Sequence, residues 1–177
     1  MNPKSFREHL NQTSTDFITE APHMNYPTGV YVAVLPDEET NTSIKNFQNE
    51  LKKDLLKDVE MNDEIHTTLI YSNKPLKEKV KHTNKHHKAS FDGYALFGEE
   101  QDVLVMKLKS VSLHERNQEL TNEYGFISDY DSYNPHITLS YGAKGVDLSK
   151  LPDYNGSIVL HKEYSEDLDE DWGDTNE

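Results

Sequence analysis

A short motif that occurs twice constrains the fold of this chain more than any other feature. The residues His-x-Thr-Leu stand at positions 66–69 and again at 136–139, so the two histidines are 70 residues apart. Both copies lie in apolar, β-branched runs that predict strands. Each of these strands follows a predicted helix, at residues 41–59 and 112–124. A helix–strand unit repeated in a 177-residue chain predicts two similar α+β lobes that face each other.

The remaining predicted elements complete an antiparallel sheet. Further strands are expected at residues 29–35, 91–97, 103–108 and 157–161. We predict an α+β fold of two pseudo-symmetric lobes of antiparallel sheet, with helices packed outside and a central cleft that bears the two His-x-Thr strands. Residues 1–27 are expected to form an irregular arm, residues 28–162 the bilobal domain, and residues 163–177 an acidic tail or flap.

Composition excludes several classes of function. The net charge is −14, from 18 basic and 32 acidic residues, and long nucleic acids bind chiefly to cations, so a long nucleic acid is not the expected partner. The absence of cysteine excludes thiolate metal sites and a cysteine nucleophile. The sequence has no apolar run of roughly 18 residues and no apolar signal core, so an intracellular protein without a membrane span is expected.

The two motifs are expected to present their polar side chains together. Because side chains alternate along a strand, His66 shares a face with Thr68, and His136 shares a face with Thr138. The opposite, core-facing set is expected to comprise Ile65, Leu69, Tyr71, Ile137, Leu139 and Tyr141. Two such strands side by side would therefore offer two imidazoles and two hydroxyls to one cleft.

This set of groups suits the cleavage of a phosphodiester without a metal. Imidazole has an ordinary pKa of about 6.5, so near neutral pH one ring can accept a proton while the other donates one. Each such proton transfer contributes roughly 100- to 10,000-fold to the rate. Threonine hydroxyls can donate hydrogen bonds to the non-bridging oxygens, where negative charge develops.

The motifs resemble those of the two-histidine (2H) phosphoesterase superfamily, and within it the phage anti-CBASS phosphodiesterases. The likeness spans residues 29–161 and rests on G-V-Y-V-A-V-L-P, E-I-H-T-T-L-I-Y, N-P-H-I-T-L-S-Y and the tail E-D-L-D-E-D-W-G-D. The resemblance implies an enzyme that hydrolyses 3′–5′ bonds of cyclic di- and trinucleotides containing adenine or guanine. It would work without metal or cofactor in the host bacterial cytoplasm, so that a phage evades CBASS immunity.

The resemblance also implies roles for individual residues. His66 and His136 would be the acid–base pair, in an order that the motifs leave open, and Thr68 and Thr138 would hold the phosphate. Apart from the resemblance, Tyr31 alternates with Val30 and Val32, so its ring is expected on the cleft face of the first strand, where it would contact substrate, although strand aromatics also pack in cores.

Two acidic-tail residues are expected to reach the nucleobases. Trp172 would stack on a base and Glu166 would hydrogen-bond a base edge, unless the tail is simply disordered. Tyr130 and Tyr133, in the loop before the second motif, could form the rim of the site.

Several alternatives remain open at this point. The Lys- and His-rich segment 74–88 could be a solvated loop or a lid, and its His82 and His86, four residues apart, could bind a transition metal. The same two-histidine site could act instead on 2′,3′-cyclic phosphates or 2′–5′-linked RNA. The chain could also be a sponge that binds cyclic nucleotides without cutting them.

Overall fold

The protein is represented by a computed structural model that describes residues 24–128 and 132–168. The strands of this part are β1 (Val30–Pro36), β2 (Thr67–Ser72), β3 (His87–Phe97), β4 (Val103–Lys109), β5 (His136–Ser140) and β6 (Ile158–Asp167). The helices are α2 (Glu38–Asp54) and α3 (Val111–Tyr124), with a 3₁₀ helix η1 (Leu148–Lys150). The strands pair antiparallel in the order β2-β1-β6-β3-β4-β5, which confirms the α+β class.

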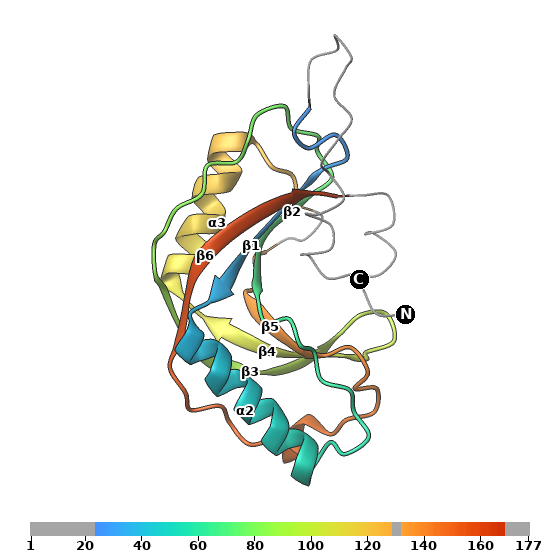
Figure 1. Cartoon of the computed structure of the whole chain (residues 1–177). Coiled ribbons are helices and arrows are strands. Elements are labelled where there is room, and N and C mark those ends of the chain that lie inside the picture. Colours follow the sequence, from blue (N-terminus) through green and yellow to red (C-terminus); the bar gives the residue numbers. More distant parts are fainter. Residues whose placement is uncertain (1–23, 129–131, 169–177) are drawn as a thin grey trace, which may run out of the picture.

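The predicted pseudo-symmetry is present as two strand–helix–strand units. In one unit β1 and α2 precede the motif strand β2, which pairs with β1; in the other β4 and α3 precede the motif strand β5, which pairs with β4. The long strands β3 and β6 join the two halves. The sheet curves strongly, so its two edge strands β2 and β5 lie side by side (Figure 1).

One large core lies between the sheet and the two helices. Val30, Val32 and Val34 of β1 are fully buried in it, together with apolar residues of both helices. Their neighbours Tyr31 and Ala33 point to the opposite, concave face because side chains alternate along the strand. There they form a second, smaller cluster, which also contains Leu168, Tyr71 and Tyr164. The concave face is therefore lined by aromatic residues from β1, β2 and β6.

The helices begin and end where their caps dictate. The carboxylate of Asp37 accepts a hydrogen bond from Thr40 N at 2.8 Å and starts α2 three residues before the prediction. This helix ends at Asp54, so Leu55, which the periodicity placed on its apolar face, is 46% exposed. Gly125, in the left-handed conformation at φ 66°, ends α3 as predicted. Within the described residues, neither helix is long and apolar enough to cross a bilayer.

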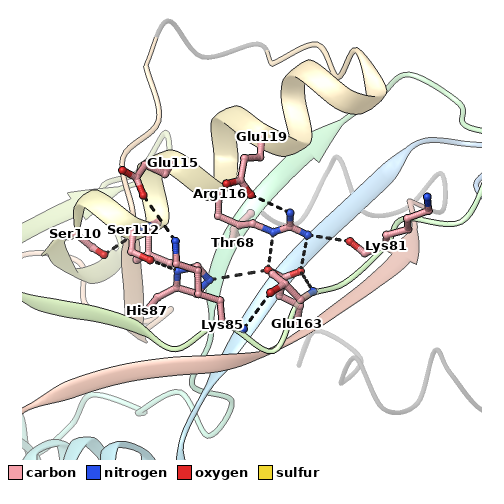
Figure 2. Close-up of polar contacts among 12 residues, drawn as sticks. Thr68, Lys81, Lys85, His87, Ser110, Ser112, Glu115, Arg116, Glu119 and Glu163 are labelled. Carbon is pink, nitrogen blue, oxygen red and sulfur yellow. Dashed lines mark hydrogen bonds and ion pairs between the residues drawn. The ribbon is translucent and has the colours of Figure 1, made fainter.

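Strand β6 extends further into the acidic C-terminal region than its composition indicated. It continues to Asp167, which pairs with Val30 of β1, whereas a strand ending at residue 161 was expected. An acidic strand is tolerated here because Glu163, on the helix-covered face, meets the guanidinium of Arg116 from α3 (Figure 2). The first five residues of the predicted tail are thus part of the sheet.

The Lys- and His-rich region packs on the helix-covered face. Its residues 73–86, here called the strap, run beside α3 into β3 (Figure 1). Lys81 N donates to Tyr124 Oη at 2.8 Å, and Lys81 O accepts from Arg116 Nη2 at 2.8 Å. Leu76 and Val80 are buried in the main core. The strap therefore covers the side of the sheet away from the concave face, a position that does not favour a lid.

Candidate active site

The structure brings the two predicted motifs together across the edges of the sheet. His66 immediately precedes β2 and His136 begins β5. The Tyr133 hydroxyl, from the loop before β5, donates to the carbonyl of Thr68 in β2 at 2.8 Å. The two imidazoles are close enough that repulsion between their charged forms acts on the pKa of His66. The two motif strands thus lie side by side as the repeat predicts, although β2 and β5 are opposite edges of the sheet and do not pair with each other.

Both imidazoles are oriented by the same local hydrogen bond. Nδ1 of His66 lies 3.1 Å from the carbonyl oxygen of Glu64, and Nδ1 of His136 lies 2.8 Å from that of Asn134, in each case two residues earlier. A carbonyl oxygen only accepts, so Nδ1 of each ring carries a proton. In the neutral ring Nε2 is then the acceptor, and both rings hold this same tautomer.

Burial favours the neutral form of both rings. The pKa of His66 is lowered chiefly by burial, and further by His136, against the opposing effect of the Glu64 carbonyl. Burial likewise lowers the pKa of His136, although the Asn134 carbonyl works in the other direction. Each ring is therefore prepared to accept a proton and would hold one most readily beside an anionic ligand.

The threonine hydroxyls are each paired with a tyrosine. Thr68 Oγ1 lies 3.0 Å from the hydroxyl of Tyr31, and Thr138 shares a side-chain hydrogen bond with Tyr141. Burial raises the pKa of Tyr31 and of Tyr141, so both phenols keep their protons and can donate. Each threonine can then direct its own proton to a ligand.

A β-bulge at the same position in both motif strands explains why Tyr71 and Tyr141 lie on the concave face, whereas strict alternation predicts that they face the core. The register of each motif strand shifts by one residue directly after the threonine, at Leu69 in β2 and at Leu139 in β5. Such a β-bulge turns the residue three positions after the threonine back to the threonine's face. The repeat is therefore His-x-Thr-Leu-x-Tyr, and the core assignment of the two tyrosines was wrong.

Carboxamides from the helices satisfy the carbonyl groups at both bulges. Asn117 of α3 donates to Leu69 O at 2.7 Å, and Gln48 of α2 donates to Leu139 O at 3.1 Å. An extra residue in a bulge is left outside the ladder, so its carbonyl needs another donor. Each bulge is thus supported by the helix of the opposite unit.

Of the three residues predicted to bind substrate, two are buried on the concave face and one lies outside the described residues. Tyr31 is only 4% exposed and lies beneath the site, with its ring 6.3 Å from that of His66 in an edge arrangement. Glu166 is its partner in the β1–β6 register and is buried. Trp172 and Tyr130 lie outside the described residues.

Two aromatic residues near the site were missed by the sequence reasoning. Phe97 at the end of β3 places its ring 5.0 Å from that of His136, in an edge arrangement that mirrors Tyr31 and His66. Tyr164 lies beside Tyr31 and would have been found had β6 been extended by alternation past residue 161. No local signal marks Phe97, because its position depends on the pairing of β3 with β4.

The histidines of the strap do not join in a metal site. His82 Nε2 lies 2.9 Å from Ser165 Oγ, whereas the ring of His86 packs 4.7 Å from that of His161. Among residues 24–128 and 132–168, no group of three or more His, Asp or Glu side chains is arranged to hold a metal ion.

Comparison with known proteins assigns the chain to a family. The family described as anti-CBASS protein Acb1 matches residues 28–175. The chain is similar to the anti-CBASS protein Acb1 of Acinetobacter phage Ac42, with 30% identity over 149 residues, covering 81% of this chain and 93% of that protein. For the Acb1 of Enterobacteria phage T4 the identity is 32% over 154 residues, covering 85% and 95%.

Solved structures show a similar fold at low sequence identity. E. coli LigT complexed with NADP+ has a TM-score of 0.52 at 15% identity, covering 79% of this chain and 87% of that one. A crystal structure of a phosphoesterase has a TM-score of 0.55 at 15% identity, covering 78% and 87%. This likeness concerns the fold, and it agrees with the predicted two-histidine phosphoesterase architecture.

Proposed function

The chain belongs to the anti-CBASS protein Acb1 family, and we propose that it hydrolyses the 3′–5′ bonds of cyclic di- and trinucleotide messengers in the cytoplasm of a phage-infected host. The observation that carries this proposal is the pair of imidazoles held in one tautomer by equivalent bonds to Glu64 O and Asn134 O. Two such rings supply a proton acceptor and a proton donor for a single phosphodiester.

The cleavage step proceeds by two proton transfers. One neutral imidazole accepts at Nε2 the proton of the ribose 2′-hydroxyl, and the 2′-oxygen forms a bond to phosphorus. The bond from phosphorus to the 5′-oxygen breaks, and the other ring, protonated, gives its Nε2 proton to that leaving oxygen. Water then opens the resulting 2′,3′-cyclic phosphate with the two roles exchanged. His66 and His136 are anchored alike, and neither role is assigned to a particular ring.

The threonines stabilise the negative charge that develops on the non-bridging oxygens of the phosphate. In this proposal the phenols of Tyr31 and Tyr141, which keep their protons, donate to the hydroxyl oxygens of Thr68 and Thr138, so each threonine proton is free to meet a non-bridging oxygen. Hydrogen bonds to developing charge are worth more in a buried site than in water. The substrate bases, adenine or guanine, would lie over the concave face above the buried side chains of Tyr31 and Glu166, and Trp172 would stack on one of them.

The pH dependence follows from the lowered histidine pKa values. The profile of kcat/KM reports the free enzyme, in which partial burial holds the pKa of both rings below the ordinary 6.5. The base is lost as the pH falls through its pKa and the acid as the pH rises through its pKa, so we expect a bell-shaped profile with its maximum below pH 6.5. The kcat profile should lie at higher pH, because a bound phosphate raises the pKa of both rings. A kcat/KM maximum well above pH 6.5 would exclude His66 and His136 as the acid–base pair.

Product analysis tests the proposed function. Purified protein would be incubated in EDTA with cyclic di- and trinucleotides, 2′,3′-cyclic phosphates and 2′–5′-linked RNA, and the products separated by chromatography. We expect linear products from the cyclic oligonucleotides. Cleavage of the other substrates alone would replace the proposal with the first alternative. Intact cyclic ligand released by heat would indicate a sponge, and activity lost in EDTA and restored by zinc would indicate a metal enzyme.

A further inference from the structure

The segment before the first motif strand is attached to the second motif strand. Asn62 lies in this segment, between α2 and β2, and its backbone N donates to Leu139 O at 2.8 Å. The Ser140 hydroxyl donates to Glu60 O at 2.6 Å. The chain that leads into His66 is therefore fixed along the outer edge of β5, across the junction of the two halves.

The side chain of Asn62 connects the two motifs directly. Its Nδ2 donates to Thr138 O at 3.0 Å and to Glu64 O at 2.8 Å, while its Oδ1 accepts from Glu64 N at 3.2 Å. The amide can satisfy two carbonyls and one N–H only in this orientation, because oxygen cannot donate. Both N–H groups of the side chain and one of the two acceptor sites on its oxygen are thereby used.

The carbonyl of Glu64 is also the group that orients the first catalytic ring. It accepts both from Asn62 Nδ2 and from His66 Nδ1. A continuous hydrogen-bonded path therefore runs from the carbonyl of Thr138 through the Asn62 amide and the Glu64 carbonyl to the imidazole of His66. Because this path joins one motif to the other, a shift at Asn62 alters the placement of His66 relative to β5.

We propose that Asn62 is a positioning residue that sets the orientation of His66 against the second motif, an inference that rests on the proposed function. Gln48, buried in α2, supports it by donating to Asn62 O at 2.8 Å and to Leu139 O at 3.1 Å. These bonds and Asn62 N hold the backbone whatever the side chain at position 62. Replacing the side chain therefore leaves the backbone at position 62 in place and releases Glu64, whose carbonyl orients His66.

Two variants and one control test this role. Asn62→Ala removes the amide, and the isosteric Asn62→Asp keeps the acceptor for Glu64 N but loses the donor to both carbonyls. A misplacement of about 1 Å can cost about 100-fold in rate, so we expect kcat to fall by about that factor in both variants with little change in KM. Asn49→Asp, which adds the same charge at an exposed position of α2, should keep the wild-type kcat.

Two further readouts separate positioning from loss of structure. In Asn62→Asp the new carboxylate should raise the pKa of His66, so one limb of the kcat/KM profile should move to higher pH. In Asn62→Ala, ¹⁵N NMR spectra of the histidine side chains should show that His66 no longer holds the Nδ1-protonated tautomer. The signals of His66 are assigned as those missing from the spectrum of His66→Ala. A folded Asn62→Asp variant with wild-type kcat, pH profile and His66 tautomer would overturn the inference. If the wild-type protein cleaves nothing, the proposed function fails, and the spectra still decide the role of Asn62.

Discussion

Replacing either His66 or His136 with alanine should lower turnover by roughly 100- to 10,000-fold, the range that one lost proton transfer costs. The double replacement should cost less than the product of the two single effects, because the rings serve one reaction. Binding of a cyclic dinucleotide should be largely kept, since the hydroxyls of Thr68 and Thr138 remain. The measurement is single-turnover cleavage together with the Kd for a 2′-deoxy cyclic dinucleotide, which lacks the attacking hydroxyl.

His86→Ala is the matched control for these variants. His86 is exposed on the strap, its ring lies against His161, and it has no part in the proposed chemistry. The His86→Ala variant should cleave substrate at the wild-type rate. If both single variants at positions 66 and 136 keep that rate as well, the assignment of the acid–base pair is wrong.

Removing the Arg116 side chain should lower the free energy of unfolding more than removing an exposed charge such as that of Lys85. Its guanidinium donates to Glu163 at 2.8 and 3.0 Å, and the Glu163 side chain is 1% exposed (Figure 2). Arg116→Met leaves that carboxylate buried beside His87 without its cation. Breaking a buried ion pair in this way costs about 3–5 kcal/mol of the free energy of unfolding. Urea unfolding followed by circular dichroism measures the loss.

An exposed ion pair of the same region provides the control. Lys85 and Glu115 lie 3.7 Å apart, with side chains 50% and 59% exposed. Lys85→Met should therefore cost less than about 1 kcal/mol. If Arg116→Met and Lys85→Met shift the urea midpoint equally, the buried cluster is not what holds the strap and β6 together.

The loss of unfolding free energy caused by Arg116→Met should become smaller as the pH falls. Although burial acts to raise the pKa of Glu163, its contacts with His87, Arg116 and Thr83 N hold that pKa below the ordinary carboxyl value. Glu163 therefore stabilises the fold above its unfolded-state pKa, and this contribution is lost as the pH falls through the folded pKa. The difference between wild type and Arg116→Met should shrink on acidification, because the orphaned carboxylate can take a proton.

The parts of the fold that depend on local periodicity could be predicted from the sequence. The two His-x-Thr strands, the helices before them and the pseudo-symmetric α+β class follow from spacing and alternation. Comparison confirms the recognition as an anti-CBASS protein of two-histidine fold, since the family matches residues 28–175. The catalytic roles of the four motif residues stay predictions, for which the structure supplies the geometry.

The remaining features depend on tertiary structure. A bulge breaks the alternation on which the placement of Tyr71 and Tyr141 relied, and nothing in the spacing of residues marks it. Strand β6 extends through acidic residues whose partners are distant in sequence: Glu163 meets Arg116, and Asp167 accepts from Thr28 N. Asn62 likewise acquires a role only when its segment lies along β5.

A crystal structure with a 2′-deoxy cyclic dinucleotide tests most directly whether both imidazoles contact the same phosphate group. We expect Nε2 of His66 and Nε2 of His136 on opposite sides of a single phosphate, with the hydroxyls of Thr68 and Thr138 on its non-bridging oxygens. A complex in which only one of the two rings reaches that phosphate, or in which the ligand binds away from both, would contradict the account.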